Sequence, residues 1–256
     1  MTRILRTIDP RDTAKMRRIQ GLCLREHIMP PPVAYVGARV YQCPPHLLVN
    51  GKIPEGLKLD ELGIAPALVY DARSQSWVRN AYNIVTQQLC ALHPYSLSHS
   101  GTGAGSLYNL RTSGAIHSNA SYLDYIRGPG DWVGGLGDTT QGIVVGTDTG
   151  AEDFNDYALG TLVAHGTGAG QLSYAAQEAT TRAYTAGTLT WAGTLIRYLN
   201  NNSGGAIVIG EVGLYVCVSA SPDEMLCRDL IDPTVSVANT AQLKVTYTIT
   251  SMAYPS

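Results

Sequence analysis

Charged residues are scarce in this sequence, where Asp, Glu, Lys and Arg together make up 15% of the 256 residues. Soluble domains carry about 25%, and a freely soluble enzyme usually exposes more charge than this chain holds. Phenylalanine is almost missing, with one residue against 15 tyrosines, while glycine reaches 27. This composition is typical of a β protein whose surface is partly covered by neighbouring subunits, and we expect a homo-oligomer.

Long apolar runs are also missing. No run approaches the roughly 18 residues that a membrane-spanning helix needs, and no apolar signal segment follows Met1, so we expect no membrane partner. The cysteines form no C-x-x-C pair, which favours free thiols in a reducing compartment. We expect them to be buried small residues, although Cys217 and Cys227 could face each other across a hairpin. The five are Cys23, Cys43, Cys90, Cys217 and Cys227.

Basic residues are concentrated in the first part of the chain. Residues 1–100 contain 12 Lys and Arg against 7 Asp and Glu, whereas residues 101–256 contain 6 against 13. A nucleic-acid interface interleaves basic with aromatic side chains, but residues 1–30 contain no aromatic residue. We interpret the asymmetry as a basic arm on an acidic body and expect no nucleic-acid partner.

The pentapeptide Gly-Thr-Gly-Ala-Gly occurs twice, at Gly101–Gly105 and Gly166–Gly170. A phosphate-binding loop needs a strand before the glycines, a helix after them, and a lysine or a ribose-binding acid at a defined distance. Neither copy opens a convincing helical pattern, and no Gly-Lys-Ser/Thr is present. We predict glycine turns at both places, with no cofactor and no small-molecule substrate.

Asp148-Thr149-Gly150-Ala151 matches the aspartic-peptidase motif and follows an apolar strand. That chemistry needs two carboxylates that share a proton. The chain has one copy of the motif, so a homodimer would be required, and Gly146-Thr147 stand where apolar residues usually precede the Asp. An Asx turn at a strand end explains these residues more simply, and we expect that the protein is not an enzyme.

Acidic residues cluster between Asp148 and Asp156, with Glu152 and Asp153 between them. Such a loop is either solvated or a Ca²⁺ site, although EF-hand spacing is absent. The histidines show no pair at metal-ligand spacing on a helix, and no Gly-x-Ser-x-Gly motif surrounds a serine. We therefore predict no catalytic, cofactor-binding or metal-binding residues. The histidines are His27, His46, His93, His99, His117 and His165.

Four apolar runs separated by turn residues fill the last quarter of the chain. In the last run, Leu243, Val245, Tyr247 and Ile249 alternate with polar residues, as in a strand buried on one face. The sequence therefore predicts a mainly β fold, with an antiparallel, jelly-roll-like β-sandwich as the body at 71–256. Asp232-Pro233-Thr234 is one of the predicted breaks. The runs are Leu189–Leu199, Ala206–Ser219, Glu224–Ile231 and Gln242–Ser251.

Two further elements are predicted in the body. Trp77–Leu92 has helical periodicity, with Val78 and Tyr82 on the apolar face and Asn83 on the polar one. Gly142–Thr147 is predicted to be a buried strand. Glu152–His165 is expected to be irregular, with a short strand at Thr161–Ala164.

Residues 1–70 are predicted to form an extended arm that begins with a helix. The helix is expected from Thr13 to about Met29, and Pro30-Pro31-Pro32 must end it. Seven of the 13 prolines lie in residues 29–66, separated by short extended runs. An isolated arm of this kind recovers too little free energy to stay ordered, so we expect it to dock on a partner subunit.

Several turns and strands carry a resemblance to known proteins: Trp77–Tyr82, Gly142–Thr147, Leu162–Tyr174, Asn201–Gly205, Glu211–Tyr215, Arg228–Ile231 with Val235, and Leu243–Ile249. Through these stretches, residues 77–251 resemble a group of virion proteins of tailed bacteriophages. The stretches include no active site, so the resemblance implies a virion component built from β-sandwiches.

Together these observations predict a structural virion protein that is made in the host cytoplasm. It would bind other virion proteins through its arm and its sandwich, in the tail, baseplate or neck. The alternatives are a capsid decoration protein or a host-glycan-binding fibre module. Glycan binding would need exposed aromatic platforms, for which the candidates are Trp132, Trp191 and Tyr198.

Overall fold

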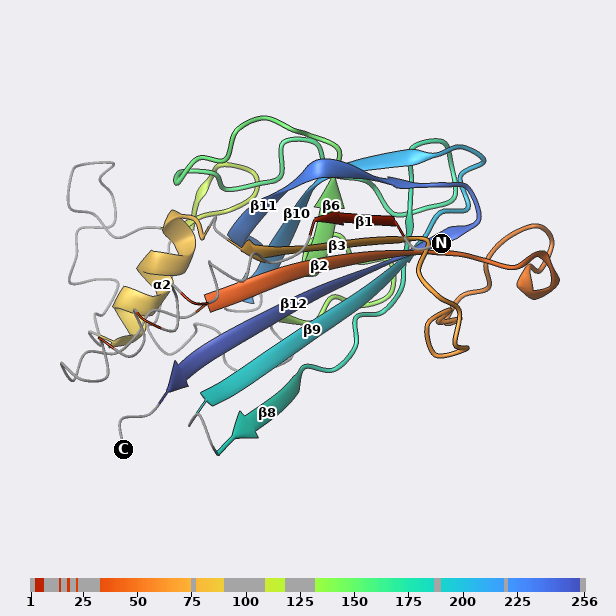
Figure 1. The fold of residues 1–256 in the computed structure, drawn as a ribbon. Coiled ribbons are helices and arrows are strands. Elements are labelled where there is room, and N and C mark those ends of the chain that lie inside the picture. The colour runs from red at the N-terminus through yellow and green to blue at the C-terminus, as the bar shows by residue number, and fades with distance from the viewer. Residues whose placement is uncertain are drawn as a thin grey trace.

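A computed structural model describes most of the chain. The described residues are 3–6, 33–74, 77–89, 109–117, 132–186, 190–218 and 221–253, with the single positions 14, 18 and 22. They form mainly β-strands, and helix α2 (Arg79–Leu89) lies at one end of the molecule (Figure 1). The strands are β1 (Arg3–Arg6), β2 (Val33–Gln42), β3 (Leu68–Ser74), β4 (Asn109–Leu110), β5 (Ile116–His117), β6 (Gly142–Gly146), β7 (Ser173–Tyr174), β8 (Thr181–Thr185), β9 (Thr190–Asn200), β10 (Ile207–Val218), β11 (Ser221–Val237) and β12 (Ala241–Ala253).

Two sheets, antiparallel except for the β1–β3 pair, pack against each other, which confirms the predicted sandwich. The larger sheet has the order β1-β3-β2-β12-β9-β7, and β8 also pairs with β9. The smaller has the order β11-β10-β6. The chain therefore crosses between sheets after β9 and returns after β11, so that β12 lies between β2 and β9 (Figure 1).

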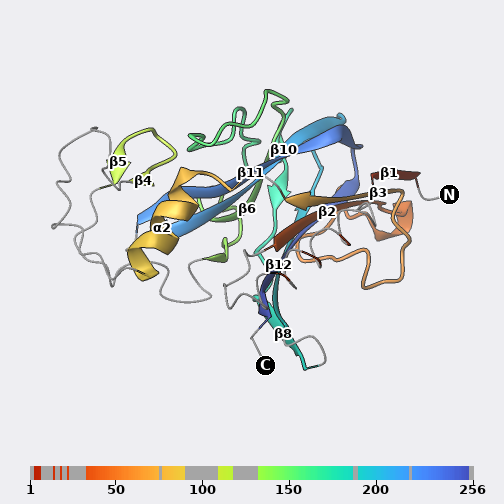
Figure 2. The ribbon, with the colours of Figure 1, turned by 60° about the vertical axis from the view of Figure 1, so that its left-hand side comes forward.

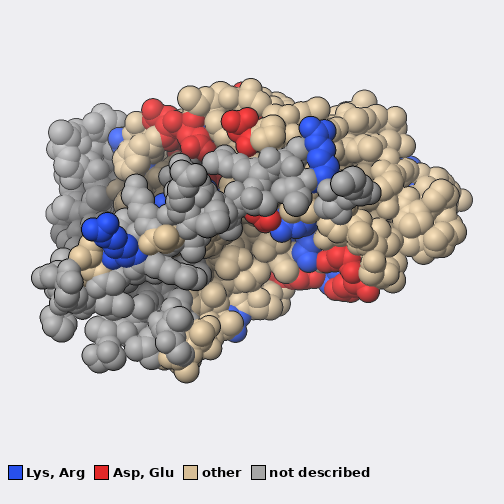
Figure 3. Space-filling view, in the orientation of Figure 1, with Lys and Arg blue, Asp and Glu red and all other residues tan. Residues whose placement is uncertain are grey.

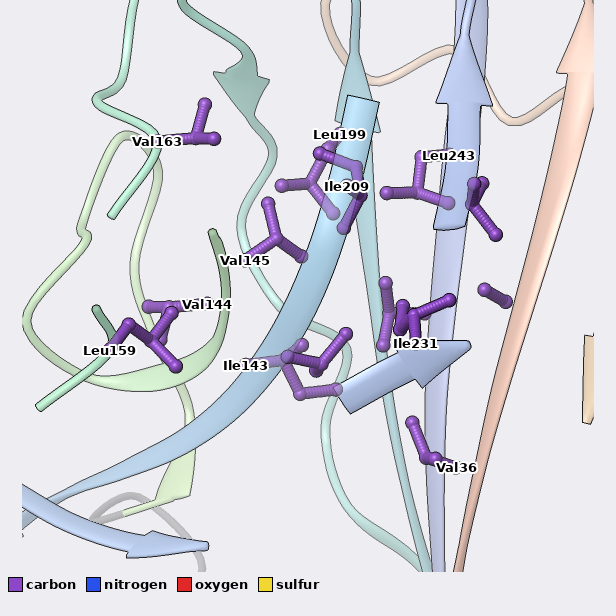
Figure 4. Close-up of a cluster of buried hydrophobic side chains, with 14 of the residues drawn as sticks. Val36, Ile143, Val144, Val145, Leu159, Val163, Leu199, Ile209, Ile231 and Leu243 are labelled. Atoms are coloured by element: carbon purple, nitrogen blue, oxygen red, sulfur yellow. The ribbon is translucent and has the colours of Figure 1, made fainter. Parts of the chain in front are cut away.

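The core lies between the two sheets. Ile143 and Val145 from β6 and Ile209 from β10 meet Leu199 and Leu243 from the larger sheet (Figure 4). The alternation predicted for β12 is confirmed, because Leu243, Val245 and Tyr247 are fully buried and Lys244, Thr246 and Thr248 are partly exposed on the other face. Continuous burial of β6 confirms the strand predicted at Gly142–Thr147.

The described part of the Pro-rich segment, residues 33–66, is folded onto the body of its own chain. β2 lies between β3 and β12, so the predicted boundary at 70/71 falls inside the larger sheet. Residues 43–67 then form a compact loop, with a 3-10 turn at Pro45–Leu47 and a small apolar cluster that includes Ile53 and Leu59. The loop covers one end of the outer sheet face, where Gln242 accepts from Leu59 N and donates to Leu57 O.

The predicted break at Asp232-Pro233-Thr234 is wrong, because β11 continues to Val237. Ile209 pairs with Val235 and Glu211 with Leu230, so residues 231–234 bulge opposite Gly210. β11 is an edge strand of its sheet, and a proline is tolerated at such an edge because the missing N–H need not break a ladder of hydrogen bonds.

Helix α2 is confirmed, although its buried face differs from the predicted one. Val78, just before it, is buried as expected, and Ile84 is buried too, but Tyr82 is 57% exposed and Asn83 is buried. Part of the buried face is polar because Asn80 pairs with the backbone of Leu110 in both directions. An amide that replaces a strand partner in this way is not visible in hydrophobic periodicity.

The remaining predicted elements have mixed outcomes. Glu152–His165 is irregular, as expected, but the predicted strand at Thr161–Ala164 is reduced to a single bridge between Gly146 and Leu162. The helix predicted from Thr13 to Met29 lies outside the described residues, except for Ala14, Arg18 and Leu22, which are helical and exposed. No helix of the described chain is long and apolar enough to cross a membrane.

Candidate functional site

The predicted acidic loop closes around a buried arginine of β11. Arg228 Nε donates to Glu211 Oε2 at 2.7 Å, and its Nη1 and Nη2 donate to Asp156 Oδ2 and Asp148 Oδ2 at 2.9 Å each. Its Nη groups also donate to the carbonyls of Gly150 and Ala151 at 3.2 Å. We name Arg228, Glu211, Asp148 and Asp156 the Arg228 cluster. It ties the loop after β6 to the two long strands of the smaller sheet.

Glu211 is the innermost carboxylate of this cluster and is fully buried. Besides Arg228, it accepts the N–H groups of Gly160 and Thr161 at 3.1 and 2.9 Å. Burial by itself would lower the pKa of Arg228, but the hydrogen bonds to Glu211 and Asp156 outweigh it and raise that pKa above its usual value. The guanidinium therefore stays charged and compensates the buried carboxylate.

The Asp148-Thr149-Gly150-Ala151 motif lies at the rim of the Arg228 cluster. Asp148 Oδ1 accepts the N–H groups of Thr149 and Gly150 at 2.9 and 3.2 Å, which is the Asx turn that the sequence favoured. Its other oxygen is bound to Arg228. A peptidase dyad needs this carboxylate to share a proton with a second one, whereas here it forms an ion pair with a guanidinium.

The other acids of the loop also have backbone partners. Glu152 accepts the N–H of Leu230 at 2.7 Å, and Asp153 accepts that of Asn155. Within the described residues, no group of His, Cys, Asp and Glu side chains could hold a metal ion. The positive charge beside Asp148 and Asp156 is Arg228. Acidic side chains gather along the upper edge of the face shown in Figure 3.

A second buried arginine, Arg197 of β9, has only carbonyl partners among its hydrogen bonds. It donates to Gly135 at 2.7 Å, Ile143 at 2.9 Å, Ala175 at 3.0 Å and Gln141 at 3.2 Å. The guanidinium carbon also lies 4.9 Å from the ring centroid of Tyr174. Burial lowers the pKa of Arg197 to about 10. This side chain fixes the loop before β6 to the larger sheet.

A third polar group lies between the two sheets. Asp229 accepts from Tyr247 at 2.8 Å and from Ser74 at 2.9 Å, and all three are buried. Burial raises the pKa of the neighbouring Cys227 thiol well above its usual value. In the β10–β11 pair, Cys227 lies opposite Leu214 and Cys217 opposite Pro222, so these two cysteines do not face each other. Together with the two arginines, this group links strands and loops.

The second Gly-Thr-Gly-Ala-Gly segment forms a turn, as predicted. Gly166 and Gly170 adopt positive φ, and Gly168 N donates to Gln171 Oε1 at 2.9 Å. His165 and Leu172 form a bridge at its base, and no helix follows. His165 Nδ1 accepts the N–H of Tyr174 at 3.1 Å. The first copy, at Gly101–Gly105, lies outside the described residues.

The outer face of the larger sheet carries an open hollow of about 430 Å³. There Gly37 of β2 pairs with Asp71 of β3 and with Thr246 of β12. Because glycine has no side chain, the space between Asp71 and Thr246 stays open. The lining includes Tyr35, Tyr41, Arg39, Asp71, Lys244 and Thr248. Arg39 forms a two-pronged ion pair with Asp71 at 2.7 and 2.9 Å.

Of the three proposed aromatic platforms, one is exposed. Trp191 is 40% exposed, whereas Tyr198 is buried and donates to Asp60. Trp132 packs against the core. Tyr184 is 46% exposed beside Trp191, with the two ring centroids 5.1 Å apart.

Sequence reasoning missed the Arg228 cluster because its members are far apart in the chain. A usable signal was present, since Glu211 and Arg228 each interrupt an apolar run that was predicted to be a strand. A charge in such a run needs a buried partner of opposite sign.

No protein-family model, curated protein or solved structure matches the chain.

Proposed function

We propose that this chain is a structural component of a tailed-bacteriophage virion. It would assemble through its leading segment and its sandwich, in the tail, baseplate or neck. The assignment to a tailed-bacteriophage particle is based on the resemblance of residues 77–251 to virion proteins of such phages. The geometry supports a mechanical role, because the buried polar groups around Arg228, Arg197 and Asp229 hold loops and strands together.

The proposed mode of assembly is based on strand β1 at the edge of the larger sheet. Residues Arg3–Arg6 pair as β1 with β3, parallel to it, at the edge of the larger sheet. β2 begins only at Val33, so a long connection separates the edge strand from the next strand of the body. The same short strand from a neighbouring subunit fits the same edge, as in other strand-exchanged assemblies.

The test is a count of the protein in purified particles. We expect the chain in virions at a fixed copy number. A few copies per virion would indicate the neck, dozens the tail, and hundreds the capsid. Quantitative mass spectrometry against isotope-labelled peptides of this chain gives the number. Presence in infected cells but absence from purified particles would contradict the proposal.

A second candidate, glycan binding, is favoured by the hollow over β2 and β12. Tyr35, which is partly exposed, offers aromatic surface there beside Lys244 and the Arg39–Asp71 pair. A glycan-array experiment with the native chain and with Tyr35→Ala tests it. Binding that the substitution removes would favour this function, and absence of binding would exclude it.

A further inference from the structure

Strand β8 is an unprotected edge of the larger sheet. It pairs with β9 along one side, and no described strand pairs with its other side. All five of its residues are exposed. In Figures 1 and 2, β8 and the adjacent ends of β9 and β12 project from the body. Natural proteins usually protect such an edge with charged side chains, proline or a bulge. β8 contains no proline or bulge, and Arg182 is its one charged residue.

The side chains of β8 divide into two unlike faces. Arg182 and Tyr184 share one face, where they lie opposite Gly193 and Trp191 of β9. Tyr184 and Trp191 form an exposed aromatic pair. Arg182 has no bulky cross-strand neighbour, because Gly193 lies opposite it.

This face also contains a hollow of about 280 Å³ beside the aromatic pair. Arg182, Gly193 and Ile249 line it, together with Thr180 and Trp191. Ile249 continues the core-facing side of β12, so the apolar face of the sheet extends beyond the part that the smaller sheet covers. The edge and the hollow together form a surface with one cation, two aromatic rings and open space next to the cation.

We propose that β8 pairs antiparallel with β8 of a second copy of this chain, with Ala183 opposite Ala183. The strand sequence Thr-Arg-Ala-Tyr-Thr is self-complementary about Ala183. A two-fold axis there places Arg182 of each copy directly opposite Tyr184 of the other, on one face. Thr181 faces Thr185 in the same arrangement.

The chemistry of this row favours a second copy as the occupant. In the isolated chain, Arg182 and Tyr184 are the outermost side chains of two neighbouring cross-strand pairs, Gly193–Arg182 and Trp191–Tyr184. In the pair, each guanidinium comes to lie beside the partner's aromatic residues, where a cation–π contact stabilises it. The hollow over Gly193 leaves room for the partner's ring. The two larger sheets become one continuous sheet, a closed interface that buries both exposed edges.

A disulfide at the two-fold axis tests the pairing and its register. In Ala183→Cys, the two thiols lie opposite each other, with Cα atoms about 4.5–5.5 Å apart, which a disulfide can bridge. In the matched control Thr181→Cys, the two thiols are offset by four residues, about 13 Å along the strand, and cannot bridge. Both positions are exposed, and circular dichroism checks that both variants fold.

We expect a covalent dimer of Ala183→Cys under mild oxidation, and no more dimer from Thr181→Cys than from the native chain. Sedimentation of Tyr184→Ala should show dimerisation weakened about tenfold, because the substitution removes two symmetry-related ring contacts. Equal cross-linking at 183 and 181, or none at 183, would overturn the proposal. These outcomes are independent of the virion count, since they report only on the free protein.

Discussion

Arg228 Nε and Glu211 Oε2 lie 2.7 Å apart, on neighbouring strands of the smaller sheet. Glu211 has no exposed surface, so its charge depends on this guanidinium and on two backbone N–H groups. The same guanidinium reaches two acids of the loop after β6. One side chain therefore determines both the pairing of two strands and the position of a loop.

Replacing Arg228 should strongly destabilise the fold. Arg228→Met leaves Glu211 buried and uncompensated, for which we expect a loss of about 3–5 kcal/mol in the free energy of unfolding. Arg39→Met is the matched control, because the Arg39–Asp71 pair is about a quarter exposed and should contribute about 1 kcal/mol or less. Urea unfolding measures both, and equal losses would contradict the assigned role of the Arg228 cluster.

Two adjacent glycines should respond oppositely to alanine. A Cβ on Gly134 would clash with the backbone carbonyl oxygen of Gln141 and lie 2.6 Å from Arg197 Nη1, closer than a Cβ can approach without a shift of these atoms. Gly134→Ala must therefore displace both the Gln141 carbonyl and the buried guanidinium, and we expect a loss of about 1–3 kcal/mol. A Cβ on Gly135 meets nothing within 4 Å, so Gly135→Ala should be neutral or stabilise by about 0.4–1 kcal/mol. Thermal unfolding of the two variants distinguishes them, and similar melting temperatures would show that Arg197 adapts freely.

The elements that could be predicted from sequence are those whose signal is local. β12 alternates cleanly, β6 is continuously apolar, and α2 repeats at helical spacing. Val33–Tyr41 is one of the extended runs expected between the prolines and coincides with β2. The flanking prolines indicate an arm, because the pairing of β2 with β3 and β12 is specified by tertiary contacts. The sequence predicts a break within β11 because a proline such as Pro233 interrupts a strand in the interior of a sheet. β11 lies at the edge of its sheet, where proline is tolerated.

The polar groups were less predictable than the strands. Asp148 and Asp156 were recognised as an acidic loop, and the Asx turn at Asp148 was anticipated. Their partner Arg228 lies 80 residues from Asp148, and no short-range pattern joins the two. Periodicity reports which face of a strand is buried, but it does not identify which buried charge meets which.

The buried tyrosines should make the fold sensitive to alkali. Burial raises the pKa of Tyr215 to about 12 and that of Tyr247 well above its usual value. Unfolded tyrosines titrate near pH 10, so stability should be complete below about pH 10 and fall as the pH rises toward the folded values. Tyrosinate absorbance should therefore rise together with the loss of circular dichroism.

Tyr247→Phe removes one of these groups and should make the alkaline decline in stability shallower. The exposed Tyr184 supplies the control, since Tyr184→Phe should leave the decline unchanged. Ionisation of all the tyrosines before any loss of structure would show that the buried phenols are accessible in the folded protein.

Incorporation of a truncated chain into particles tests the proposed assembly most directly. A chain lacking residues 1–32 keeps β2 and the rest of both sheets, and it loses β1 from an edge. We expect it to retain a cooperative unfolding transition but to be nearly absent from particles when it competes with the full chain during infection. Incorporation of the truncated, folded chain at the level of the full chain would contradict assembly through the leading segment.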